Sequence, residues 1–333
     1  MATPPQWIAG ARPRTLPAAV APVLAATGVV AYLHAEIWWK AILAMLVSLL
    51  LQVGVNYAND YSDGIRGTDE DRVGPMRLVG SGAASPGSVK KAAFLAFGLA
   101  AIAGLVLAAT TAWWLVALGA VSILAAWFYT GGSKPYGYLG LGEVMVFCFF
   151  GLAAVLGTVF VQWHSHTAYF DFTAGGRLPA DFAVHHDWRG CLSLPAGATV
   201  DGCVRISPWP AAWFAAVGIG AIACAILVAN NLRDIPTDAE SGKMTLAVRL
   251  GDRRTRIFYA VLVLVAVLAL VGVALASSFA ALVALVAFIP LGRGTSTVLR
   301  GANGPGLIPV LQATGVGELL YGAGIFIGLL VAR

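Results

Sequence analysis

Long apolar segments with few charged residues recur along almost the whole chain, and short polar segments separate them. A helix needs about 20 apolar residues to cross the hydrocarbon of a bilayer, and nine segments reach or approach that length. The chain is therefore predicted to be an all-α polytopic membrane protein, a bundle of nine transmembrane helices. The predicted spans cover residues 15–33, 41–59, 92–111, 113–129, 141–161, 210–230, 257–276, 277–292 and 307–331.

The composition agrees with this pattern. Hydrophobic residues make up 59% of the 333 residues and charged residues 11%, about half the charged fraction of a soluble protein. The mean hydropathy is +0.81. These values exclude a water-soluble globular protein, a disordered chain and a coiled coil, and four cysteines are too few for a disulfide scaffold.

The positions of the basic residues predict the orientation, because Lys and Arg in short loops stay in the cytoplasm. An N-terminus in the cytoplasm places most of the 21 basic residues on the inner side, and nine spans then place the C-terminus outside. Arg12 and Arg14 precede the first apolar segment as in a signal peptide. Because eight more spans follow, we interpret this segment as a retained helix.

One long polar segment, residues 162–210, interrupts the apolar pattern and lies outside the cell in this topology. It holds four of the five histidines, in a pattern without the partners and spacing of a metal site, so a solvated loop is expected. Cys191 and Cys203 also lie in this segment. An external compartment permits a disulfide between them, and the sequence leaves that question open.

The first of two polar clusters follows the second span. Helical spacing places Asn56, Asp60 and Asp63 on one face, and Asn59 lies one turn before Asp63. Carboxylates in this arrangement repel each other at low dielectric unless a cation lies between them. Glycines after the cluster predict that the chain leaves the helix and folds Asp69 and the following basic residues back over it.

The second cluster lies at the inner end of the sixth span. Asn230, Asp234 and Asp238 are spaced by four residues, and Pro236 predicts a kink or a break between the two aspartates. Two separate helices thus present an asparagine and two aspartates at the same membrane depth.

This donor set is typical of a site for Mg²⁺ and a diphosphate. Mg²⁺ binds a few carboxylates while it bridges to phosphate oxygens, and interleaved basic residues neutralise the remaining charge. The candidate metal ligands are Asn59, Asp60, Asp63, Asp69, Asp234 and Asp238. The candidate diphosphate-binding residues are Asn56, Asn59, Arg66, Arg72, Arg77, Lys134, Arg233 and Lys243.

Other interpretations of the clusters were weighed against this site. A single charge at the end of a span is ordinarily a topology anchor, but two matched acid sets exceed that role. A secondary transporter expects inverted repeats and a site near the bilayer midplane, whereas these acids lie at span ends on one side. A structural membrane protein has no reason to hold two matched acid sets.

At these residues the chain resembles the UbiA superfamily of intramembrane prenyltransferases. Residues 59–63 are similar to the first aspartate-rich motif of that family and residues 234–238 to the second, and the resemblance covers nearly the whole chain. Within the family, the surrounding segments resemble the branch that prenylates 1,4-dihydroxy-2-naphthoate. One departure is Gly67, which occupies the position of a third acid in many members, and Asp69 follows two residues later.

The resemblance implies a single prenyltransferase domain over residues 1–333, with 162–210 as an extracytoplasmic insert. It implies a central cavity open toward the cytoplasmic face and a place in the bacterial plasma membrane. The implied reaction is Mg²⁺-dependent transfer from a polyprenyl diphosphate to 1,4-dihydroxy-2-naphthoate, with decarboxylation to demethylmenaquinone. No nucleic acid is expected as a partner.

The resemblance also assigns roles and leaves others open. The residues expected to act in catalysis are Asp60, Asp63, Asp234, Asp238, Lys134 and Tyr129, the last as a ring that faces the allylic cation. The sequence assigns no general base. The alternative acceptors are 4-hydroxybenzoate and a sugar phosphate.

Overall fold

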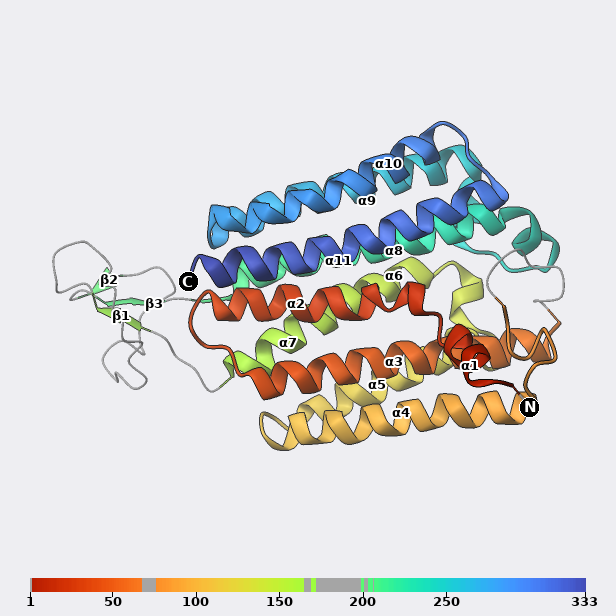
Figure 1. Cartoon of the computed structure of the whole chain (residues 1–333), viewed down its shortest axis with the longest axis horizontal. Coiled ribbons are helices and arrows are strands. Elements are labelled where there is room, and N and C mark those ends of the chain that lie inside the picture. The colour runs from red at the N-terminus through yellow and green to blue at the C-terminus, as the bar shows by residue number, and fades with distance from the viewer. Residues whose placement is uncertain (1, 68–75, 165–168, 172–198, 201–202, 206) are drawn as a thin grey trace.

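The protein is a bundle of long helices that run side by side (Figure 1). A computed structural model describes residues 2–67, 76–164, 169–171, 199–200, 203–205 and 207–333. The N-terminus and the C-terminus lie at opposite ends of the bundle (Figure 1). The end that carries the N-terminus also carries the inner ends of the two helices with the aspartate clusters, and we call it the acid end.

The helical elements follow the apolar segments of the sequence closely. Two spans contain a change of helix type: one includes a π-helical stretch, η3, and another begins with a 3-10 stretch, η4. The elements are α1 (Pro4–Gly10), η1 (Pro13–Thr15), α2 (Pro17–Ala31), α3 (Trp38–Ile65), α4 (Pro86–Ala109), α5 (Trp114–Phe128), η2 (Tyr136–Leu139), α6 (Gly142–Val146), η3 (Phe147–Ala153), α7 (Ala154–Trp163), α8 (Trp209–Glu240), α9 (Leu246–Ala276), η4 (Phe279–Ala287), α10 (Phe288–Leu299), η5 (Gly304–Leu307) and α11 (Ile308–Val331).

The helices confirm the predicted class of all-α membrane protein. Among the described residues, seven helical segments are long and apolar enough to cross a bilayer, and the bent pair formed by residues 4–15 and α2 makes an eighth. The helix α5 is apolar but only 15 residues long. The count of nine spans therefore stays a prediction.

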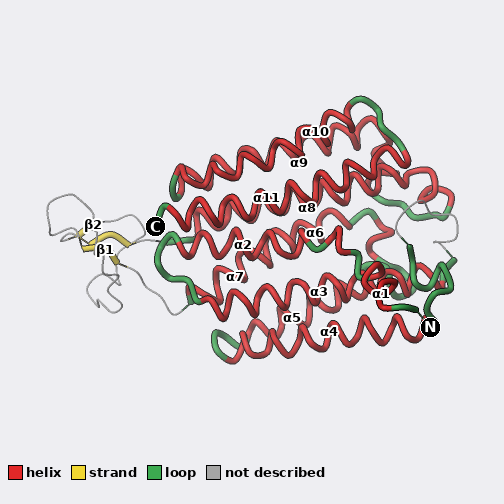
Figure 2. The backbone as a smooth tube through the Cα atoms, viewed as in Figure 1, coloured by secondary structure: helices red, strands yellow, loops and turns green. Residues whose placement is uncertain are grey.

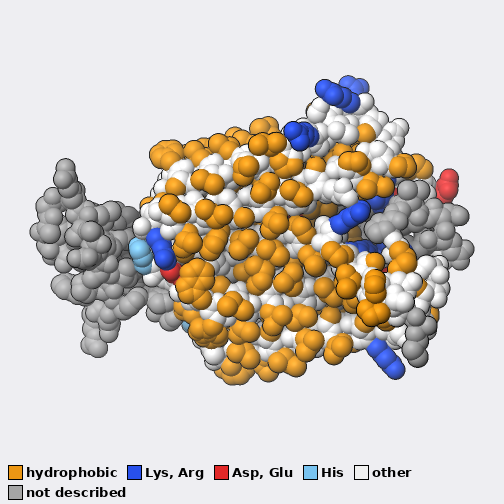
Figure 3. All heavy atoms as spheres, viewed as in Figure 1, with side chains coloured by type: hydrophobic (Ala, Val, Ile, Leu, Met, Phe, Trp, Pro, Cys, Tyr) orange, Lys and Arg blue, Asp and Glu red, His pale blue; other side chains and the backbone are white. Residues whose placement is uncertain are grey.

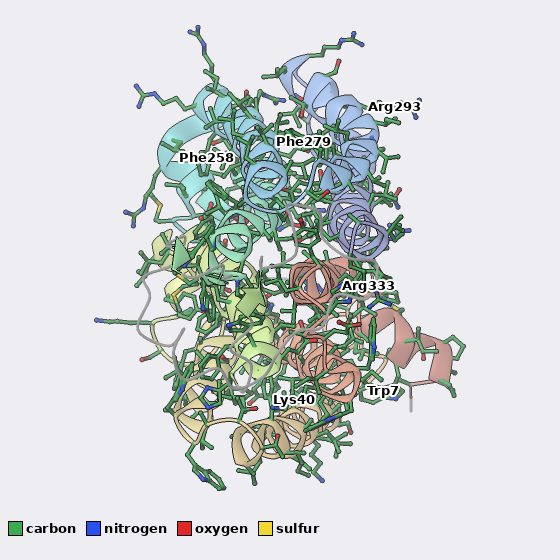
Figure 4. All side chains as sticks on the ribbon, turned by 90° about the vertical axis from the view of Figure 1, so that its left-hand side faces the viewer. Trp7, Lys40, Phe258, Phe279, Arg293 and Arg333 are labelled. Carbon is green, nitrogen blue, oxygen red and sulfur yellow. The ribbon has the colours of Figure 1, made fainter. Side chains whose placement is uncertain are left out.

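The outer surface of the bundle is apolar over its middle and charged near its ends (Figure 3). Isolated large side chains such as Ile102, Leu264 and Leu275 are exposed there, as expected for a surface that faces lipid. Figure 4 looks along the helices from the end opposite the acid end. At that end Arg333 pairs with Glu36 and thereby ties the C-terminus to the connection between α2 and α3.

Small residues bring the helices of one half of the bundle into close contact. A Cβ atom added at Gly322 of α11 would lie 2.7 Å from Cα of Ala21 in α2, and one added at Gly28 would lie 2.6 Å from Cα of Phe326. Close packing of small residues is a main source of helix association in membranes. It makes α2 and α8 to α11 a solid block with a continuous apolar core.

The predicted insert contains the three strands of the described chain (Figure 2). They are β1 (Tyr169–Asp171), β2 (Thr199–Val200) and β3 (Cys203–Arg205), and β3 lies between the other two in an antiparallel sheet. Tyr169 pairs with Arg205, and Thr199 pairs with Val204. The proposed Cys191–Cys203 disulfide and most of the histidines of the insert lie outside the described residues.

Two predictions about the aspartate clusters were wrong in detail. Both clusters lie on the helices themselves, because α3 continues to Ile65 and α8 to Glu240, beyond the predicted spans. The expected kink or break at Pro236 is also absent from α8, which runs through it. Pro236 lies in the last turns of the helix, where few hydrogen bonds remain to be lost and the carbonyl groups can reach water.

Candidate active site

The two aspartate clusters meet at the acid end through Tyr138. The Tyr138 hydroxyl donates a hydrogen bond of 3.0 Å to Asp63 of α3. The Lys243 ammonium lies 5.5 Å from the centre of the same ring and forms an ion pair of 3.2 Å with Asp238 of α8. One aromatic side chain therefore connects an acid of the first cluster with the ion pair of the second.

A second set of contacts holds the loop after α5 against α3. The Thr130 hydroxyl donates a hydrogen bond of 2.8 Å to Oδ1 of Asn59. The Arg66 guanidinium donates to the backbone oxygens of Thr130 and Gly132 and lies 5.6 Å from the ring of Tyr138. Arg66 thus brings a positive charge beside Asp63 without an ion pair of its own among the printed contacts of the described residues.

The basic residue of the second cluster is buried with its acid. Arg233 binds Asp234 through two hydrogen bonds of 2.6 and 2.7 Å, and it also donates to Asn230 at 2.9 Å. Arg233 and Asp234 are 7% and 6% exposed. This pairing places a cation and an anion within reach of one ligand at the acid end.

Asp60 and Asn56 contact the chain that covers the acid end. The carboxylate of Asp60 is fully buried and accepts backbone hydrogen bonds from Leu78 at 2.8 Å and Val79 at 3.0 Å. The Asn56 amide donates to the backbone oxygen of Ala11 at 2.8 Å. Helical periodicity explains part of the difference, since Asp60 lies at the edge of the face shared by Asn59 and Asp63.

The remaining predicted residues are less central. Lys134 is exposed in the loop after α5, and Arg77 is half-buried beside the Asp60-bound turn. Asp69 and Arg72 lie outside the described residues. The structure therefore brings together Asn59, Asp63, Asp234, Asp238, Arg66, Arg233 and Lys243, and it gives Asn56 and Asp60 other contacts.

An elongated cavity of about 330 Å³ begins beside this cluster and extends between α2, α3, α4, α5 and the span from α6 to α7. Asn56, Asn59, Tyr129 and Tyr136 line it near the acid end. The rest of the lining is mainly apolar and includes Leu107, Leu115, Leu118, Phe149, Phe150 and Val161.

Two tyrosines stand at the polar end of this cavity. The rings of Tyr129 and Tyr136 meet edge to face with their centres 5.5 Å apart. The Tyr136 hydroxyl donates to the backbone oxygen of Ala125 at 2.7 Å, and burial raises its pKa. Tyr136 is therefore a neutral hydrogen-bond donor, whereas Tyr129 presents a ring where the sequence predicted one.

Several polar residues of the site were not predicted. Tyr138 links the clusters, and buried Glu143 accepts a hydrogen bond of 3.0 Å from Asn231, one turn before Asp234. Gln52 also lines the cavity. A signal for Gln52 is present in the sequence, because Gln52, Asn56, Asn59 and Asp63 repeat at helical spacing, but that stripe begins deep in an apolar span.

The donor set at the acid end fits Mg²⁺. Among the described residues, no three His, Cys, Asp or Glu side chains are grouped closely enough to hold a metal ion. Mg²⁺ at a phosphate site needs one or two carboxylates, because phosphate oxygens and waters complete its octahedron. Asp63 with the Asn59 amide, and Asp234 with Asp238, supply hard oxygen ligands of this kind on the two helices.

The chain belongs to the UbiA prenyltransferase family, whose model matches residues 17–301. Membership agrees with the all-helical membrane fold and with the paired aspartate clusters. The predicted resemblance to this family is confirmed.

Curated relatives cover nearly the whole chain. A 1,4-dihydroxy-2-naphthoate octaprenyltransferase of Mycobacterium tuberculosis is 50% identical over 321 residues, which are 96% of this chain and 95% of the relative. Proteins of the same name from Escherichia coli and Bacillus subtilis are 32% and 26% identical. They align with 98% and 96% of this chain, and with 96% and 91% of their own lengths.

Solved structures share the fold at low sequence identity. The apo structure of a UbiA homolog from Aeropyrum pernix K1 has a TM-score of 0.65 at 13% identity and covers 93% of this chain and 97% of its own. A UbiA homolog from Archaeoglobus fulgidus bound to DMAPP and Mg²⁺ has a TM-score of 0.55 at 13% identity and covers 98% and 99%.

Proposed function

We propose that the chain transfers a polyprenyl group from a polyprenyl diphosphate to 1,4-dihydroxy-2-naphthoate and so forms demethylmenaquinone. The names of relatives at up to 50% identity support this acceptor. The structural observation that carries the proposal is the link from Asp63 through Tyr138 to Lys243 and Asp238, at the polar end of an apolar cavity.

The acid end has the residues to bind the diphosphate with Mg²⁺. Asn59, Asp63, Asp234 and Asp238 would hold the metal, which supplies positive charge to the diphosphate as the allylic C–O bond breaks. The Archaeoglobus fulgidus homolog that shares the fold binds DMAPP and Mg²⁺. Because Asp60 already accepts two backbone hydrogen bonds, we leave it out of the proposed metal ligands.

The basic residues beside these acids would exchange partners when the diphosphate binds. Lys243 and Arg233 are now paired with Asp238 and Asp234. Once the metal shares the carboxylates, the ammonium and the guanidinium can turn toward phosphate oxygens. Arg66 already lies beside Tyr138 and adds a third positive charge next to the leaving group.

The cavity would hold the apolar tail and exclude water from the allylic cation. Its wall of leucine, valine and phenylalanine side chains starts directly beyond Tyr129. An aromatic face stabilises a nearby cation, and a dry wall prevents its capture by water. The ring of the acceptor then forms a C–C bond with the cation, the diphosphate leaves with the electrons of the C–O bond, and the carboxyl group departs as CO₂.

We place the acid end at the cytoplasmic face of the bacterial plasma membrane, with the N-terminus inside and the C-terminus outside. The excess of basic residues at the acid end supports this orientation. The two termini lie at opposite ends of the bundle (Figure 1), as this orientation requires. A diphosphate and an aromatic acid from the cytoplasm would then reach the site directly.

The direct test is product formation in membranes that contain the chain. With octaprenyl diphosphate, 1,4-dihydroxy-2-naphthoate and Mg²⁺, we expect demethylmenaquinone, and EDTA should abolish it. Asp63→Ala and Asp238→Ala should each abolish product, whereas Glu36→Gln at the opposite end of the bundle should retain it.

The choice of acceptor is tested in the same membranes. Replacing the naphthoate by 4-hydroxybenzoate or by a sugar phosphate should give no product. Efficient transfer to either of these acceptors, with none to the naphthoate, would contradict the proposed function.

A further inference from the structure

The cavity wall contributed by α3 is polar along one stripe. Ser48, Gln52, Asn56 and Asn59 all line the cavity, and they repeat at spacings of four, four and three residues, which keeps them on one helix face. Gln52 is the deepest amide of the stripe and is 7% exposed. Its side chain therefore lies in the part of the cavity where the lining changes from polar to apolar.

The orientation of the Gln52 amide is fixed by Thr15. The Thr15 hydroxyl donates its hydrogen to the backbone oxygen of Arg12 at 2.9 Å. Toward other groups it can therefore act only as an acceptor. Gln52 Nε2 and Asn56 Nδ2 both donate to it, each at 2.9 Å, so the oxygen of the Gln52 amide must face away from Thr15.

This oxygen is left without a hydrogen-bond partner among the described residues. A buried acceptor without a partner costs folding free energy, and such groups in native proteins usually have a functional or solvent partner. Other hydroxyl groups of the lining are already in use. Ser48 donates to the backbone oxygen of Ala19, and Ser122 donates to that of Leu118, both at 2.8 Å.

We propose that Oε1 of Gln52 accepts a hydrogen bond from a ring hydroxyl of the aromatic acceptor. The inference rests on the proposed function and names a residue that selects its acceptor. Because an amide oxygen can only accept, the ligand group must be a donor such as a phenolic hydroxyl. A carboxylate, which only accepts, cannot replace it.

The depth of Gln52 suits this role. Eleven residues separate Gln52 from Asp63, and eleven residues of α-helix rise about 16 Å. This length leaves room for a metal-bound diphosphate at Asp63 and for a bicyclic ring that reaches inward to Gln52. A hydrogen bond from the hydroxyl to Gln52 would also fix the ring against the α3 stripe and leave the apolar wall to the prenyl tail.

The experiment compares binding of three acceptors to purified protein in detergent. The probes are 1,4-dihydroxy-2-naphthoate and its two analogues that lack one hydroxyl, 1-hydroxy-2-naphthoate and 4-hydroxy-2-naphthoate. We expect the wild type to bind the diol about tenfold to a hundredfold more tightly than one of the analogues, because a missing donor leaves the buried oxygen unpaired.

Gln52→Met keeps the volume of the side chain but removes the oxygen, and it should reduce this ratio to about one. The KM for the polyprenyl diphosphate should stay within about twofold, because Gln52 contacts only the acceptor in our proposal. Ser48→Ala, one turn deeper on the same stripe, is the matched control and should keep the ratio of the wild type. An unchanged ratio in Gln52→Met would overturn the inference.

Gln52→Glu provides an independent measurement, including the case in which the methionine variant does not fold. It retains an acceptor oxygen, and it should keep or increase the ratio; a ratio near one would overturn the inference. Turnover of the diol is measured in the same preparations. Absence of product in the wild type contradicts the proposed function, whereas product together with an unchanged binding ratio in Gln52→Met contradicts only the role of Gln52.

Discussion

The hydroxyl of Tyr138 donates a hydrogen bond of 3.0 Å to the carboxylate of Asp63. Its ring at the same time lies under two cations, Lys243 at 5.5 Å and Arg66 at 5.6 Å. Tyr138 belongs to the short helix η2 between two spans, so this loop residue sets how far apart the acids of α3 and α8 are held. The spacing of the metal-binding groups therefore depends on the loop as well as on the helices.

Tyr138→Phe should weaken diphosphate binding while it keeps the aromatic ring. The variant loses one hydrogen bond to a charged group, an interaction of about 1.5–3 kcal/mol. We expect the KM for the polyprenyl diphosphate to rise about tenfold, measured by steady-state kinetics at saturating acceptor. Tyr136→Phe is the control, because its hydroxyl bonds only to the Ala125 backbone; an equal effect in both variants would argue against the link.

Asp60 and Asp63 should respond differently to the concentration of Mg²⁺. Asp63→Asn removes a proposed metal ligand, so the Mg²⁺ concentration for half-maximal activity should rise at least tenfold. Asp60→Asn leaves one acceptor oxygen for the Leu78 and Val79 amides and should lower stability by about 1–3 kcal/mol. Its Mg²⁺ dependence should match that of the wild type, and a raised requirement would show that Asp60 binds metal.

The close contact between α2 and α11 should make Gly322 intolerant of a side chain. Gly322→Ala places a Cβ 2.7 Å from Cα of Ala21, and overpacking of this kind costs about 1–3 kcal/mol. The midpoint of thermal unfolding in detergent should fall. Gly292→Ala in α10 is the control, because its Cβ meets nothing within 4 Å, and its midpoint should stay the same or rise.

Gly157 should control the length of the prenyl tail that the cavity admits. It lines the cavity, and a Cβ at this position meets nothing within 4 Å, so Gly157→Leu would project into the open space. We expect the preference among diphosphates of four to eight isoprene units to shift toward shorter tails, as measured by competition between substrates. Gly98→Leu adds the same side chain outside the lining and should leave the preference unchanged.

The sequence predicted the features that follow from periodicity. Apolar length predicted the helical spans, and four-residue spacing predicted that α3 and α8 each present their asparagine and aspartates together. Contacts made by distant segments could not be predicted in this way. Asp60 differs from Asp63 because the Leu78–Val79 turn folds onto it, and nothing in the local pattern of either aspartate encodes where that turn lies.

Two further differences have local causes that compete with each other. Pro236 predicts a break, but its position in the last turns of α8 makes the loss of one hydrogen bond affordable, so the helix continues to Glu240. The short strands of the insert, such as Cys203–Arg205, lie in a polar segment without the alternation that would indicate a sheet. In both cases the sequence signal was weaker than the structural context.

The cavity-lining residues come from α2 through α7, whereas α8 presents Asp234 and Asp238 from the densely packed block formed with α9 to α11. Hydrocarbon recognition and one half of the metal grip are thus mounted on different parts of the molecule. Damage to the packed block should therefore appear as a defect in magnesium affinity, with tail selection intact. Changes that enlarge or narrow the hollow part can accumulate without disturbing the aspartates carried by α8, which offers evolution a route to new isoprenoid lengths with unaltered chemistry.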